Sequence, residues 1–142
     1  MSVATVGEQG KRFLVIGAGF SGSLLSAILA RHGKQVTLID HAKHPRFVIG
    51  ESSTPAAGLI LRTLVKRYGL SELGPLTRYG RWVNELASVR RGAKQGFSYF
   101  FHQADTDFQV AESHPNELLV AASSALELAD TQWLRSDVDQ FL

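Results

Sequence analysis

The sequence contains no cysteine, one methionine and four prolines among its 142 residues. The absence of cysteine excludes disulfide bonds, thiolate metal sites and a catalytic thiol within this chain. No apolar run approaches the roughly 20 residues that a membrane-spanning helix needs. Residues 1–10 are polar and lack the charged and then apolar layout of a secretory signal. The composition therefore predicts a soluble globular protein whose default location is cytoplasmic.

Positive and negative charges are unevenly distributed along the chain. Residues 43–94 contain ten lysines and arginines against three acids, whereas residues 95–142 contain eight acids and Arg135 as the single lysine or arginine. Such asymmetry can accompany nucleic-acid binding, but no interleaved ladder of aromatic and basic residues supports that interpretation here. We expect a solvated basic face that pairs with the acidic segment, and no nucleic-acid partner.

The histidines show no pattern typical of a metal centre. His41 and His44 are three residues apart, but Pro45 follows at once and no carboxylate and histidine set of known ligand spacing accompanies them. We expect solvated loop histidines and no metal site.

The most informative motif is Val15–Gly22, which reads V-I-G-A-G-F-S-G. It follows an apolar strand-like run over 11–16, typical of a fully buried parallel strand, and opens a helix-compatible run over 20–32. Glycines at this spacing allow a tight turn, close approach of backbone N–H groups to a pyrophosphate, and close packing of the helix on the strand. The pattern predicts a nucleotide-binding βαβ unit. The turn residues expected to contact the cofactor are Gly17, Gly19, Phe20, Ser21 and Gly22.

Two polar residues extend this motif. A second strand is predicted over 35–39, and Asp40 ends it about 20 residues past the glycines, where a carboxylate can accept hydrogen bonds from ribose hydroxyls. The alternative is that Asp40 only ends the strand. Arg46 follows closely and could reach a diphosphate.

The rest of the chain predicts further helices and an aromatic-rich β segment. A helix begins at Pro55, with Ser53 or Thr54 as its cap, and stops near Gly69. Residues 71–81 are turn-rich, strands are predicted over 95–102 and 117–121, and a helix starts at 136. No second glycine-punctuated βαβ unit follows the first. We therefore predict an α/β protein with a Rossmann-like unit over 1–54 and a second segment over 55–142, together the first part of a larger protein.

A second motif, P-R-F-V-I-G-E-S-S-T-P over residues 45–55, narrows the class. Combined with G-A-G-F-S-G, it resembles the flavin-dependent halogenases, within the wider glutathione-reductase-type FAD fold. The resemblance also covers the strand over 96–102 and the segment D-T-Q-W-L-R-S-D-V-D-Q-F-L near the end. It implies that FAD is the cofactor and that the chain is an N-terminal part.

The resemblance also implies roles for single residues. Gly50 would permit close backbone approach to an isoalloxazine, Ser52 supplies a hydroxyl, and Glu51 offers an acceptor or a charge partner. Helix capping is the alternative role of the serines. Arg135 becomes a candidate FAD contact, the alternative being a surface arginine that pairs with Asp137 or Asp139.

A catalytic lysine would hold or polarise a hypohalous acid, because a cation can donate a hydrogen bond to it. Lys94 occupies the region where the family carries that lysine. Lys66 or a neighbouring arginine could take the place instead, and an exposed turn lysine is the remaining interpretation of Lys94. The tryptophan-x-tryptophan-x-isoleucine-proline motif associated with halogenases is absent from these residues.

By this resemblance the full protein is an oxidoreductase that uses reduced FAD, O₂ and halide on an electron-rich substrate, such as an aromatic molecule, free or bound to a carrier. A separate flavin reductase would supply the reduced FAD. The alternatives are a geranylgeranyl-reductase-like or hydroxylating flavoprotein, an inactive truncated FAD-binding fragment, or NAD binding through the same turn. We expect the 142-residue chain alone to be inactive.

Overall fold

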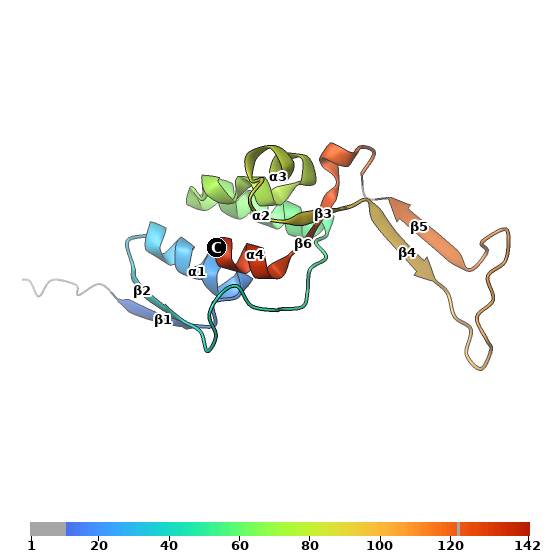
Figure 1. The fold of residues 1–142 in the computed structure, drawn as a ribbon, viewed down its shortest axis with the longest axis horizontal. Helices are drawn as coiled ribbons and strands as arrows, with labels where there is room; N and C mark the ends of the chain where they lie inside the picture. Colours follow the sequence, from blue (N-terminus) through green and yellow to red (C-terminus); the bar gives the residue numbers. More distant parts are fainter. Residues whose placement is uncertain (1–10, 122) are drawn as a thin grey trace, which may run out of the picture.

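The first two strands are parallel and are joined by a helix. β1 (Arg12–Ile16) pairs with β2 (Gln35–Ile39), with Phe13 opposite Val36, and α1 (Phe20–Arg31) connects them. This confirms the predicted βαβ unit. The structure is a computed structural model that describes residues 11–121 and 123–142 (Figure 1). Residues 1–10, where we expect no secretory signal, lie outside the described residues.

The prediction that the first strand is fully buried is wrong for this chain. Leu14 and Ile16 are 62% and 79% exposed, whereas Phe13 and Val15 are partly buried. Alternate residues of a strand point to opposite faces. Among the described residues β1 pairs only with β2, which leaves its other edge unpaired, and the face that carries Leu14 and Ile16 is open.

Local signals set the bounds of the second helix, α2 (Pro55–Tyr68). The hydroxyl of Thr54 accepts a hydrogen bond from the backbone N–H of Ala57 at 3.2 Å, and Pro55 occupies the first turn. Gly69 ends the helix in the left-handed conformation at φ 65°. The turn-rich segment after it forms the 3-10 helix η1 (Ser71–Thr77) and the short helix α3 (Tyr79–Glu85).

Two antiparallel ribbons follow. β3 (Arg91–Lys94) pairs with β6 (Asp130–Trp133), and β4 (Gly96–Phe100) pairs with β5 (Glu117–Ala121). The β4–β5 ribbon projects from the body as an arm, and the short η2 (Leu126–Leu128) leads back from it (Figure 1). The strands over 95–102 and 117–121 are therefore confirmed, whereas β3 and β6 were not predicted. Aromatic side chains such as Phe100 and Phe101 are exposed on the arm.

One hydrophobic core joins both segments of the chain. Trp82 of α3 is fully buried and donates its indole N–H to the carbonyl of Val89 at 2.9 Å. α4 (Arg135–Phe141) packs beside α1, and its Val138 is buried in the same cluster. The other buried members are Leu24, Leu61, Leu70, Leu73, Leu76 and Val89. Among the described residues, no helix is long and apolar enough to cross a membrane.

Candidate functional site: a groove between the glycine turn and the Gly-Glu-Ser loop

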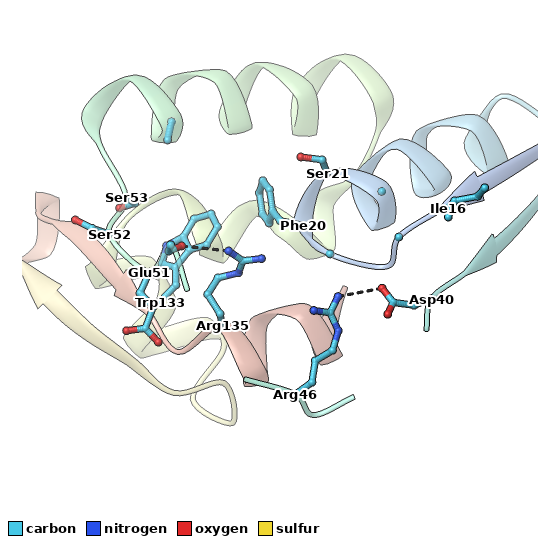
Figure 2. Close-up of a pocket in the computed structure, with 15 residues that line it drawn as sticks. Ile16, Phe20, Ser21, Asp40, Arg46, Glu51, Ser52, Ser53, Trp133 and Arg135 are labelled. Atoms are coloured by element: carbon cyan, nitrogen blue, oxygen red, sulfur yellow. Dashed lines mark hydrogen bonds and ion pairs between the residues drawn. The ribbon is translucent and has the colours of Figure 1, made fainter. Parts of the chain in front are cut away.

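The two sequence motifs face one another across a groove of about 630 Å³ (Figure 2). The glycine turn after β1 lines one side, and residues 50–53 line the other. All of the predicted cofactor-contact residues line this groove: Gly17, Gly19, Phe20, Ser21, Gly22, Asp40, Arg46, Gly50, Glu51, Ser52 and Arg135. The remaining lining residues are Ile16, Ser53, Ala57 and Trp133.

The three glycines have different physical requirements. Gly17 has φ +103°, a conformation that favours glycine, and its N–H donates to the Ile39 carbonyl at 2.7 Å. A Cβ at Gly22 would overlap the carbonyl oxygen of Gly17. A Cβ at Gly19 would meet nothing closer than 3.8 Å and would enter the space faced by Arg46 and Arg135. The turn therefore leaves its backbone open to a ligand at Gly19.

Asp40 fastens the glycine turn. Its carboxylate accepts from the backbone N–H of Ala18 at 2.7 Å and of Ala42 at 3.0 Å, and from Arg46 at 3.1 Å. These hydrogen bonds, led by that from Ala42, lower the pKa of Asp40 below its usual value. The sequence indicated a ribose contact or a strand end, and neither interpretation anticipated this bracing of the turn. The ribose contact stays a prediction.

His44 also contacts the turn, so the expectation of a solvated loop histidine is wrong at this position. Its Nε2 lies 3.0 Å from the carbonyl oxygen of Ala18. Its Nδ1 is buried and has no hydrogen-bond partner among the described residues. No spacing signal indicated this contact, because it depends on how the loop after β2 folds back.

The Gly-Glu-Ser loop is held by main-chain pairing with β6. The N–H of Trp133 donates to the Glu51 carbonyl at 2.7 Å, and the N–H of Ser53 donates to the Thr131 carbonyl at 3.0 Å. The Ser53 hydroxyl accepts from the N–H of Thr131 at 2.9 Å. Ser53 therefore joins the loop to β6, while Thr54 alone caps the helix.

Phe20 and Trp133 provide an aromatic wall. Their ring centroids are 4.8 Å apart, and both residues line the groove. Trp133 was not among the predicted site residues, although it lies in the D-T-Q-W-L-R segment that carried the resemblance. Its register opposite Arg91, rather than its local sequence, brings it to the groove.

Arg135 lines the groove and links α4 to the Gly-Glu-Ser loop. It forms a two-bond contact with Asp139, at 2.8 and 3.0 Å, and donates to the carbonyls of Ile49 and Gly50 at 3.0 and 3.2 Å. Its side chain is only 14% exposed, so it is not a surface arginine. Asp137 instead pairs with Arg90.

Lys94 lies outside the groove lining. It is 5% exposed and donates to the carbonyl of Ser53, and its ammonium lies 3.5 Å from the ring centroid of Phe97. Burial lowers the pKa of Lys94, and the negative charge of Asp130 opposes that shift. Asp130 is its direct partner across the β3–β6 ladder. The interpretation of Lys94 as an exposed turn lysine is therefore wrong.

The groove has the donors that a dinucleotide diphosphate requires. The Nε of Arg46 is buried without a hydrogen-bond partner among the described residues. The guanidinium groups of Arg46 and Arg135 both face the groove (Figure 2), and each has an η nitrogen within 4 Å of the position that a Cβ of Gly19 would take. These two guanidinium groups can donate charge-assisted hydrogen bonds to an anionic ligand beside the open backbone at Gly19. The residues present fit a dinucleotide.

Comparison with known proteins agrees with the nucleotide-binding fold. The family model for an NAD(P)-binding Rossmann-like domain matches residues 15–70. The chain is 31% identical over 136 residues to tetracycline 7-halogenase of Kitasatospora aureofaciens, covering 96% of this chain and 23% of that protein. It is 34% identical over 130 residues to monodechloroaminopyrrolnitrin halogenase PrnC of Pseudomonas fluorescens, covering 91% and 22%.

Solved structures give the same result. The fold matches that of halogenase PltM, crystallised with phloroglucinol and FAD, with a TM-score of 0.73 and 32% sequence identity. The match covers 94% of this chain and 25% of that one. The chain thus spans about a quarter of the length of the relatives that it matches.

Proposed function

Because this chain belongs to the flavin-dependent halogenase family and matches about a quarter of its relatives' length, we propose that it is the FAD-binding part of a halogenase-like oxidoreductase. The observation that carries this proposal is the meeting of the glycine turn and the Gly-Glu-Ser loop in one groove that Arg46 and Arg135 also line. When bound, FAD would supply the redox chemistry with O₂.

The two ends of the groove suit the two halves of FAD. The glycine turn, Asp40 and Arg46 offer backbone and guanidinium donors and a carboxylate, as the adenosine diphosphate half requires. Gly50 and Ser52 with the Phe20–Trp133 wall offer close backbone approach and an aromatic surface, which suit the flavin half. The groove is thereby expected to orient the flavin ring near residues 50–53.

Lys94 is the proposed cation for the oxidant. Burial lowers the pKa of Lys94, which makes its ammonium a better proton donor than that of an exposed lysine. The ammonium has three donors, and the Ser53 carbonyl takes one of them, which leaves donors for a hypohalous acid.

We propose an aromatic or otherwise electron-rich small molecule as substrate, a separate flavin reductase as the source of reduced FAD, and action in the cytoplasm. A hydroxylating flavoprotein is the second candidate, because Lys94 does not line the groove.

The test uses the whole protein that contains this chain. It is supplied with FAD, a flavin reductase, O₂, bromide or chloride, and phloroglucinol as an electron-rich probe, and products are identified by mass spectrometry. We expect bound FAD and a halogenated product. Bound FAD with only hydroxylated product would favour the second candidate, and failure to bind FAD would overturn both.

A further inference from the structure

Arg135 uses nearly all of its hydrogen-bonding capacity on protein partners. A guanidinium has five N–H donors in a planar fork. Nε and one η nitrogen bond the two carboxylate oxygens of Asp139, and the other η nitrogen bonds the carbonyls of Ile49 and Gly50. These four hydrogen bonds leave one N–H, on the η nitrogen that also contacts Asp139. Its partner is not among the described residues.

The η nitrogen with the remaining donor lies beside the glycine turn. It lies 3.9 Å from the position that a Cβ of Gly19 would take. An η nitrogen of Arg46 lies 3.8 Å from the same position. Arg46 is in turn held by Asp40 at 3.1 Å. Two guanidinium groups from distant parts of the chain therefore converge on Gly19.

Asp139 is a buried carboxylate that does not line the groove. Its side chain is 0% exposed, and both oxygens are bonded to Arg135 one helical turn earlier on α4. One of these oxygens is 4.0 Å from the Cβ position of Gly19, so the pair must stay intact for the site to attract an anion. A buried ion pair often adds little to stability, because removing two charges from water costs about as much as their attraction returns. Stability alone therefore does not explain this pair.

We infer that Asp139 is a positioning residue for the diphosphate of the bound dinucleotide. By holding Nε and one η nitrogen of Arg135, it fixes the plane of the guanidinium. The free N–H then points to the glycine turn, while the other η nitrogen ties down the Ile49–Gly50 segment. Arg135 thereby acts at the diphosphate together with Arg46, rather than at the flavin ring alone. This inference rests on the proposed function of the groove.

The test measures binding of three ligands to the whole protein and to Asp139→Asn. FAD and ADP contain the diphosphate, and riboflavin contains only the flavin end. We expect Asp139→Asn to weaken FAD and ADP binding by at least about tenfold, because a charge-assisted contact loses its orientation. Riboflavin binding should change less than threefold. A merely structural role would weaken all three ligands alike.

The matched control is Asp137→Asn on the same helix. Asp137 pairs with Arg90 away from the groove, so this variant should bind all three ligands as the original protein does. Should Asp139→Asn fail to fold, Arg135→Lys replaces it, since lysine keeps the charge and loses the fork. It should show the same ADP-selective loss.

The outcomes separate the inference from the proposed function. If the unmodified protein binds neither FAD nor ADP, both are overturned. If it binds them and Asp139→Asn binds them equally well, the inference alone is overturned. Equal losses for ADP and riboflavin would also overturn it.

Discussion

The carbonyl oxygen of Gly17 occupies the space in which a side chain at Gly22 would have to begin. Gly19 lies between them in the same turn and has open space at its Cβ position. The first relationship closes the turn, and the second leaves its backbone accessible. Substitutions at these two glycines should therefore have separable effects on stability and on ligand binding.

Gly22→Ala should destabilise the protein. The added methyl group meets backbone, which cannot rotate away as a flexible side chain could, so the turn or the start of α1 must shift. We expect the free energy of unfolding to fall by about 1–3 kcal/mol, as for other overpacked sites. Chemical unfolding of the whole protein measures this. Gly19→Ala is the control, and an equal loss in both variants would contradict the argument.

Gly19→Val should abolish FAD retention while the protein stays folded. The side chain begins 3.8 Å or more from its neighbours, so the fold accommodates it, but its branched carbons fill the space where the diphosphate approaches the backbone. Flavin absorbance after purification measures retention, and circular dichroism checks the fold. Unchanged flavin content in a folded variant would contradict the placement of the diphosphate.

Asp137 should contribute stability that disappears in acid. Hydrogen bonds from Arg90 lower the pKa of Asp137 from 3.8 to about 2. Since the pKa is depressed in the folded state, the contribution is complete above pH 3.8 and is lost as the pH falls through about 2. Arg90 is 73% exposed, which limits the contribution to less than about 1 kcal/mol.

The measurement compares the unfolding of the original protein with that of Asp137→Asn across this pH range. The difference between them should be largest near neutral pH, shrink toward pH 2, and become smaller in high salt. A difference that stays constant down to pH 2 would show that the side chain acts by another means than its charge.

Asp130→Asn should lower the pKa of Lys94 further. Burial already lowers that pKa, and the negative charge of Asp130 opposes the shift from across the β3–β6 ladder. Removing the charge removes the opposition, so the ammonium loses its proton at lower pH. The pH dependence of Lys94 acetylation, followed by peptide mass spectrometry, gives the midpoint. A midpoint that stays the same or rises would contradict this arrangement.

The helices and strands that local sequence defines were predicted well. α2 begins at Pro55 because Thr54 caps it, and it ends where Gly69 can adopt a left-handed conformation. β3 and β6 could not be predicted in the same way. R-G-A-K and D-T-Q-W show no strand pattern, and they form a ribbon only because segments about 40 residues apart meet as partners.

The residues of the candidate site differ in the same way, since some belong to local motifs and others reach the groove only through long-range contacts. Motif spacing predicted the glycine turn and Asp40, because phosphate and ribose binding require glycines and a carboxylate at fixed intervals. The family resemblance added residues 50–52 and Arg135, and all of these residues line the groove. Sequence analysis missed Trp133 and His44, and it offered Asp139 only as one possible partner of Arg135. The contact of His44 depends on how the loop after β2 folds back, and the position of Trp133 depends on the register of β3 and β6.

By itself the sequence determined the nucleotide-binding turn, the helix limits and the Gly-Glu-Ser segment, since each depends on residues within a few positions of one another. Only the tertiary structure decided which groups satisfy which charges. Asp40 braces the turn 22 residues before it, Arg135 reaches Gly50 across 85 residues, and the Ser53 carbonyl accepts from buried Lys94. Such partners are chosen by packing, because buried charges and donors must find one another wherever the fold brings them together.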